Sequence, residues 1–282
     1  MVANSAQVWK LVDSGWMRHA EFNSLKVAVL QTDAAGNLYI GTGTPHSAEV
    51  PGMGHAKVWK VDAQGKKTQL RTFKDRDIAY SMVWFQGKLH VGTMTEDLPG
   101  TAEIWRFDDP GWKRIAGRGM NGWPTNNRYA AVYEMWVHDD ALIAGTFSRT
   151  SGNGDVLELE GSRWIDLDAP QSIIALSFET FRGQLVAALS NSDRKHSNPI
   201  YALRADGKWQ PLGKAPPEWK EAYIPNHLVV IGDELYLGIG GARGTISVWK
   251  YDGTFGRSSP AMDATVHGSI RSSVRGPNGS IA

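Results

Sequence analysis

The chain contains no cysteine among its 282 residues. Disulfides, zinc–thiolate sites and cysteine nucleophiles are therefore excluded from any account of its stability or chemistry. No apolar run reaches the roughly 18 residues of a membrane-spanning helix. The N-terminal stretch MVANSAQVWK has neither the basic nor the apolar region of a signal peptide. We therefore expect no secretory leader and no membrane partner, while the compartment stays open.

An excess of charge of one sign is missing as well. Lys and Arg together number 30, Asp and Glu number 29, and the formal net charge is +1. Proteins that bind nucleic acids usually carry a basic excess or a basic stripe, because they neutralise phosphates. We therefore expect no nucleic-acid partner.

Tryptophan and glycine, in contrast, are plentiful, with 12 and 31 residues. They recur in a repeat, in which an apolar strand leads through a short turn into a second strand that often ends in Gly-Thr. A marker residue lies at the start of each second strand, and successive markers are 43 to 53 residues apart: Leu38, Leu89, Leu142, Leu185, Leu235 and Ile281. A repeat of this length is typical of propellers and related arrays.

A second hairpin type, rich in Trp, alternates with these inner pairs. It occurs at 57–70, 103–115, 155–167 and 200–212, begins again at 247–253, and has a sixth copy at 7–19. Two inner and two outer strands per repeat predict an all-β, six-bladed β-propeller with four-stranded blades, formed by residues 1–282 as one domain. The chain starts with an outer pair and ends in an inner one, so we expect its ends to pair and close the ring.

Residues 122–164 read GWPTNNRYAAVYEMWVHDDALIAGTFSRTSGNGDVLELEGSRW. Asn-Asn precedes the inner strand, Gly-Thr follows it, and a Trp-bearing outer hairpin comes next. In these features the segment resembles the degenerate repeats of kelch-like bacterial propellers. The resemblance implies the propeller architecture and names no reaction, because its motifs are structural. The Trp residues of the outer hairpins, Trp9 and Trp16 among them, are expected to pack within the blades.

The loops of the predicted propeller indicate where function lies. The connections from second to third strands and from blade to blade are long, and in a propeller they share one face. A lectin is expected to repeat one site in several blades, whereas these unlike loops favour one asymmetric pocket at the mouth of the axis. Trp123 and Trp219 lie in two of the long loops and are candidates for an aromatic wall. Loops that drift without selection are the alternative.

A polar row is expected on the innermost strands, eight residues before each marker. Its members are Ser81, Glu134, Ser177, His227 and Ser273, with Val29 in the first blade. The next position is apolar in every blade. Because strand side chains alternate between faces, we expect the apolar row to pack between blades and the polar row to lean toward the axis.

Glu134 is the carboxylate of this row and lies between Tyr133 and Met135. Its apolar neighbours are expected to raise its pKa by desolvation, which suits a general acid or base. His227, in the same row, could supply the complementary proton transfer across the channel. The structural alternatives are a carboxylate that holds serines, backbone groups or water in a wet channel, and a hydrogen-bonded core histidine.

Tyrosines and arginines near the same strands are candidate ligand-binding groups. Tyr80 and Tyr133 could stack on a ligand or donate a hydroxyl, with packing between blades as the alternative. Arg149, Arg243 and Arg271 could each hold a carboxylate or sulfate through paired hydrogen bonds. Solvated arginines are the alternative.

Small polar residues complete the expected site, namely Ser81, Ser177, Ser273 and Asn226. We expect no metal and no cofactor. An axial calcium is the exception considered, but Glu134 and Asn226 would be its only protein ligands, and calcium prefers more oxygen atoms.

Two functions fit these residues. The first is a propeller enzyme that performs metal-independent acid/base chemistry on a small polar or glycan-like molecule, as a lyase, hydrolase, isomerase or cyclase. Glu134 and His227 would be its catalytic residues, with Tyr133 and Arg271 assisting. The second is a non-catalytic lectin or protein-interaction module that uses the same face. The unlike loops favour the enzyme, and the lack of a known catalytic signature favours the binding module.

Overall fold

A computed structural model of the chain describes residues 5–44, 55–95, 98–124, 128–148, 154–190, 200–213, 224–240, 245–257 and 264–265. Every regular element within these ranges is a β-strand. No described segment forms a helix with the length and hydropathy needed to cross a bilayer. The chain divides into two compact units.

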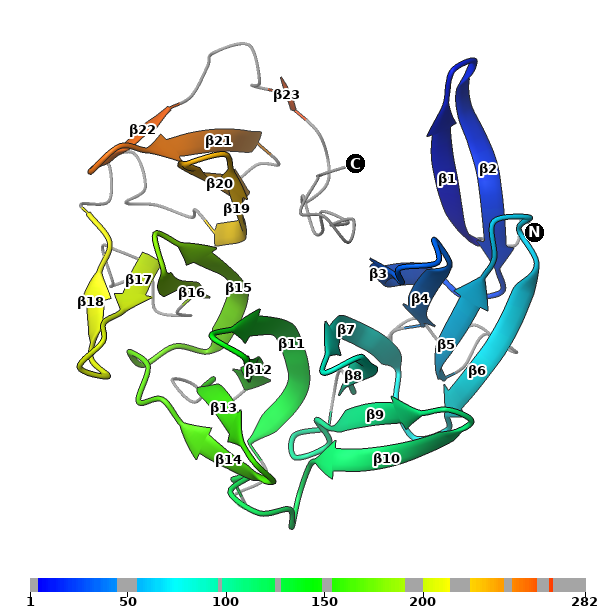
Figure 1. The fold of residues 1–282 in the computed structure, drawn as a ribbon, viewed down its shortest axis with the longest axis horizontal. Coiled ribbons are helices and arrows are strands. Elements are labelled where there is room, and N and C mark those ends of the chain that lie inside the picture. The colour runs from blue at the N-terminus through cyan, green and yellow to red at the C-terminus, as the bar shows by residue number, and fades with distance from the viewer. Residues whose placement is uncertain are drawn as a thin grey trace. The chain divides into compact units, whose positions relative to one another are not determined.

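The first unit contains the chain up to Met120 and the beginning of the eleventh strand, to Val132. It starts with a separate antiparallel hairpin of β1 (Ala6–Val12) and β2 (Gly15–Phe22) (Figure 1). Two four-stranded antiparallel modules follow. Module 1 consists of β3 (Lys26–Thr32), β4 (Leu38–Gly43), β5 (Ala56–Val61) and β6 (Lys67–Phe73). Module 2 consists of β7 (Ile78–Phe85), β8 (Lys88–Met94), β9 (Ile104–Asp108) and β10 (Gly111–Ala116).

The second unit contains residues 121–124 and the chain from Tyr133 onward. Module 3 consists of β11 (Tyr129–His138), β12 (Ala141–Ser148), β13 (Val156–Glu160) and β14 (Arg163–Asp166). Module 4 consists of β15 (Ile174–Phe181), β16 (Gln184–Ser190), β17 (Ile200–Leu203) and β18 (Trp209–Pro211). Module 5 consists of β19 (Ile224–Ile231), β20 (Glu234–Gly240), β21 (Thr245–Tyr251) and β22 (Phe255–Arg257), and β23 (Ala264–Thr265) pairs with β21.

The predicted repeat is confirmed over these five described modules and the first hairpin. Each predicted inner and outer pair coincides with two antiparallel strands, and the copy at 7–19 forms β1 and β2. The predicted sixth inner pair around Ile281 lies outside the described residues. Six blades, a closed ring and a single domain over residues 1–282 therefore stay predictions.

The apolar faces of the modules form the core. The marker residues Leu89, Leu142, Leu185 and Leu235 are completely buried, as strand alternation requires of an inward position. The expectation that every repeat Trp packs is wrong for Trp9 and Trp16, which are 51% and 69% exposed. The described residues include no inner strand pair in the same sheet as this hairpin, and Leu11 and Met17 are also exposed.

The Gly of the Gly-Thr pairs is explained by close approach of the next module. A Cβ atom at Gly92 would lie 2.2 Å from Ser81 Oγ and 2.8 Å from Val132 Cβ. At Gly41 it would lie 2.4 Å from the carbonyl oxygen of Ala79, on the first strand of module 2. Such distances leave no room for a side chain, so glycine lets two innermost strands pack directly on each other.

The Thr of the Gly-Thr pairs binds the backbone of the residue just before the third strand of its own module. Thr146 Oγ1 accepts a hydrogen bond from the Asp155 N–H at 2.8 Å and donates to the Asp155 carbonyl at 3.1 Å. Thr93 makes the same two contacts with the backbone of Glu103, each at 3.3 Å. The motif therefore joins an inner strand to its neighbours on both sides.

Candidate functional site

The innermost strands share a β-bulge that the sequence does not reveal. The pairing register shifts between Val27 and Val29 in β3, and between Ala79 and Ser81 in β7. It shifts at the corresponding places in β15, before Ser177, and in β19, before His227. In each of these four strands, the residue that belongs to the predicted row follows directly after the bulge; these residues are Val29, Ser81, Ser177 and His227. A bulge adds one unpaired residue and re-aims the side chains that follow it.

Ser81 and Ser177 use their hydroxyls to hold the next module. Ser81 Oγ donates to the carbonyl of Val132 at 2.9 Å, and Ser177 Oγ accepts from the N–H of Leu228 at 3.1 Å. Both serines are almost completely buried. For these two residues the structure shows a contact with the neighbouring innermost strand, and their expected role in ligand binding stays a prediction.

Glu134 occupies the corresponding position on β11, two residues after Val132. Burial raises the pKa of its carboxyl from 4.5 to about 8, and a hydrogen bond from the Met135 backbone N–H acts in the opposite direction. The residue as a whole is nevertheless partly exposed. A carboxyl with this pKa is mostly protonated at neutral pH and exchanges its proton within the range where enzymes work.

The other described members of the expected site lie on the same kind of strand. His227 on β19 pairs with Gly238 and is partly buried, as is Tyr133 next to Glu134. Tyr80 is buried, and the ammonium group of Lys26 lies 4.6 Å from its ring centroid. A cation at this distance interacts favourably with the ring face.

Trp123 does not stand on the surface as an aromatic wall requires. It is 4% exposed, and its ring centroid lies 5.6 Å from that of Trp164 with the planes at 82°. This edge-to-face contact gives Trp123 a packing role within the second unit.

Five expected site residues lie outside the described residues: Arg149, Trp219, Arg243, Arg271 and Ser273. For Asn226, only the backbone in β19 is described. Their expected roles stay predictions, as does the axial calcium. Among the described residues, no three His, Cys, Asp or Glu side chains gather in a way that could hold a metal ion.

Glu179 is a buried carboxylate that sequence reasoning missed. It is 1% exposed, and it accepts hydrogen bonds from the N–H of Val230 at 3.1 Å and of Thr180 at 2.9 Å. Val230 belongs to β19 of the next module, so Glu179 extends the contact that Ser177 begins. The signal was present, because Glu179 interrupts the apolar stretch LSFETF as Glu134 interrupts AVYEMW.

Comparisons with known proteins agree on the class of fold. No protein-family model and no curated protein matches the sequence. The solved structures with a similar arrangement are of β-propeller type, so the chain has an all-β, propeller-type fold.

Two solved structures illustrate this likeness. TolB from Acinetobacter baumannii aligns with a TM-score of 0.51 and 14% identity, over 88% of this chain and 58% of the TolB chain. An alpha-L-arabinofuranosidase (CtGH43) from Clostridium thermocellum ATCC 27405 aligns with a TM-score of 0.48 and 16% identity, over 85% of this chain and 95% of that chain. At these identities the likeness concerns the fold, and membership of a kelch-like family stays a prediction.

Proposed function

We propose that this protein is an enzyme of propeller fold in which Glu134 transfers a proton to or from a small polar or glycan-like molecule. One observation carries the proposal. Glu134 lies on an innermost strand as a partly exposed residue, and burial of its carboxyl raises the pKa to about 8. Perturbed carboxyl groups of this kind concentrate at functional sites, because an ordinary structural position does not retain a carboxyl that is costly to ionise.

The direction of proton transfer follows from the pKa. At neutral pH, Glu134 carries its proton, so its first role is that of a general acid that protonates a leaving oxygen or nitrogen. The ionised form left behind is a strong enough base to recover a proton from water or from a second substrate atom. His227, on the innermost strand of module 5, is the candidate for the complementary transfer.

Hydrogen bonds to the neighbouring innermost strand support a fixed position for His227. Ser177 and Glu179 bind the backbone of β19 at two places, on either side of Val229. A catalytic group needs a fixed position relative to its substrate, and hydrogen-bonded neighbouring strands supply that precision better than loops do.

The second candidate function is a non-catalytic binding module for carbohydrate or protein. It is favoured by the use of Ser81 and Ser177 in contacts between strands, which leaves fewer members of the polar row for chemistry. In this case Glu134 would bind a ligand as a neutral hydrogen-bond donor.

The test is a pH–rate profile on underivatised oligosaccharides, followed through the formation of new reducing ends. For a general acid, kcat/KM stays level below the pKa of Glu134 and falls above about pH 8. Glu134→Gln should lower kcat by about 100-fold or more. Glu160→Gln, an exposed carboxylate on β13, is the matched control and should leave kcat unchanged.

Two results would decide against catalysis. Full activity in Glu134→Gln would remove Glu134 from the reaction. Saturable oligosaccharide binding without any turnover, measured calorimetrically on the same samples, would favour the binding module.

A further inference from the structure

An arginine cluster lies on and beside the outer strands β6 and β10 of the first unit. Arg71 is on β6, Arg114 is on β10, and Arg76 follows β6. Both strands are bulged beside these residues, since the register shifts at Leu70 in β6 and at Ile115 in β10. Bulges re-aim the neighbouring side chains, and both arginines lie next to one.

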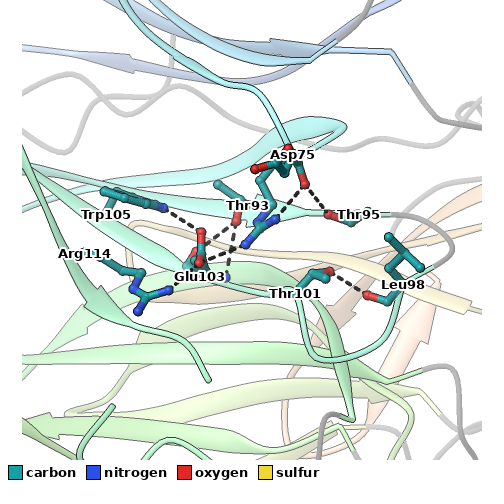
Figure 2. A network of polar contacts seen from close by, with 9 residues as sticks. Asp75, Thr93, Thr95, Leu98, Thr101, Glu103, Trp105 and Arg114 are labelled. Atoms are coloured by element: carbon teal, nitrogen blue, oxygen red, sulfur yellow. Dashed lines mark hydrogen bonds and ion pairs between the residues drawn. The ribbon is translucent and has the colours of Figure 1, made fainter. Parts of the chain in front are cut away.

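One buried carboxylate, Glu103, serves two of the three arginines. Its Oε1 accepts from Arg76 Nη2 at 2.9 Å and from Arg114 Nη1 at 2.8 Å, and its Oε2 accepts from Trp105 Nε1 at 3.0 Å (Figure 2). Glu103 is 6% exposed, so these contacts satisfy a carboxylate that has little access to water. Two positive charges therefore already share the one negative charge.

Arg71 has no ion-pair partner among the described residues. Its guanidinium carbon lies 4.0 Å from the ring centroid of Trp105, 4.9 Å from that of Phe73 and 5.8 Å from that of Trp112. Desolvation lowers the pKa of Arg71, and the charge of Glu103 opposes that effect. Stacking on aromatic rings holds the cation in place but satisfies none of its N–H groups.

Several buried donors in this cluster lack an acceptor. Within the described chain, Arg71 Nε, Arg76 Nε and Trp112 Nε1 are shut off from solvent and make no hydrogen bond. A buried N–H without a partner costs about 1–3 kcal/mol, and unpaired groups of this kind call for an ion or water. Three such donors beside a net positive charge favour an anion.

The other carboxylates nearby do not meet this need. Asp108 is held by Arg106, at 2.9 and 2.7 Å, and by Lys88 at 2.6 Å. Asp75 is exposed and contributes its backbone carbonyl to Arg76 at 2.6 Å. Among the ion pairs of the described residues, Glu103 is therefore the carboxylate of the cluster, and it contacts Arg76 and Arg114 but not Arg71.

We propose that the cluster of Arg71, Arg76 and Arg114 is a binding site for a small oxyanion, held by Arg71 and by the Trp112 N–H. Phosphate, sulfate and a sugar carboxylate share the required chemistry, which is a compact negative charge with several acceptor atoms. Such a site is independent of the polar row, and its occupancy would tie β6 of module 1 to β10 of module 2.

The experiment is calorimetric titration of the full chain with inorganic phosphate and, separately, with glucuronate, with sodium chloride at equal ionic strength as the reference. The two ligands distinguish a free inorganic anion from an acidic group carried by a sugar. We expect saturable binding of at least one of them, weakened at least tenfold by Arg71→Gln. Arg106→Gln is the matched control, because Arg106 is already paired with Asp108, and it should bind as the unaltered chain does.

Trp112→Phe provides a second variant if Arg71→Gln does not fold. It keeps an aromatic ring beside Arg71 and removes only the N–H donor, so it should weaken binding several-fold with little change in melting temperature. Heats no larger than those of sodium chloride for both ligands, or equal affinity in the unaltered chain and in these variants, would overturn the proposal.

Discussion

Glu134 retains its proton in the folded chain at pH values where an ordinary glutamate has lost it. Its folded pKa of about 8 lies above the unfolded value of 4.5. Between these two values the folded state binds more protons than the unfolded state, so stability falls as pH rises through this window and levels off above it. The shift in pKa corresponds to a loss of at most about 5 kcal/mol in the free energy of unfolding. The partial exposure of Glu134 makes the actual loss smaller.

We predict that the free energy of unfolding falls between pH 6.5 and 8.5 and that Glu134→Gln removes most of this fall. His90 does not contribute to this fall in the free energy of unfolding. Burial lowers its pKa to about 4, so its titration lowers stability only at pH values below its ordinary pKa of 6.5. Urea denaturation at both pH values measures the difference. An identical fall in the Gln variant would show that another group is responsible.

At the scale of elements, the Gly-Thr pairs of modules 1 to 3 connect the strands that carry them to their neighbours on both sides. A side chain at Gly92 would meet both Ser81 and Val132, and it would push apart β7, β8 and the start of β11. The cost of such overpacking is typically about 1–3 kcal/mol.

We therefore predict that Gly92→Ala lowers the free energy of unfolding by about 1–3 kcal/mol. Gly111→Ala is the matched control, since a Cβ at Gly111 meets nothing within 4 Å, and it should change stability by less than about 0.5 kcal/mol. Chemical denaturation of the three proteins measures both effects. Equal stability of all three would mean that the inner strands can move apart without cost.

The strands could be predicted from the sequence, whereas the orientation of the site could not. Hairpin turns, apolar alternation and the markers from Leu38 to Leu235 define pairs of strands through local chemistry alone. The bulge before Ser81 and Ser177 is set by how two innermost strands pack, and no residue type marks it. The sequence therefore indicates which residues follow the bulge, but not the hydrogen bonds that Ser81 and Ser177 make with the next innermost strand.

Glu134 and Glu179 show the same limit for charged residues. Both interrupt apolar strands, and sequence alone indicates that each carboxyl needs a reason. Only the structure distinguishes them, because Glu179 accepts two backbone hydrogen bonds while Glu134 accepts one and has a raised pKa.

At the scale of the whole molecule, the first hairpin forms a two-stranded sheet of its own among the described strands. It exposes Trp9, Leu11, Trp16 and Met17, which are half exposed or more. Apolar surface of this kind, next to an open sheet edge, favours association with another strand. The repeat predicts that the segment around Ile281 supplies that strand.

We predict that deletion of residues 272–282 lowers the melting temperature by several degrees and promotes self-association of the chain. Calorimetry and light scattering measure the two effects. A truncated chain with unchanged melting temperature and mass would contradict pairing between the two ends of the sequence.

The contacts between inner strands also bear on how such a chain can be recombined. Gln31 donates to the carbonyl of Met82 at 3.1 Å, Ser81 donates to that of Val132, and Ser177 accepts from the N–H of Leu228. The innermost strands β3, β7 and β15 thus each contact a residue 51 positions further along the chain. A four-stranded module therefore cannot be exchanged on its own. A module placed in another protein would also need the glycine of the module before it and the contacting strand residue of the module after it. The reason is that each contact between modules uses residues from both.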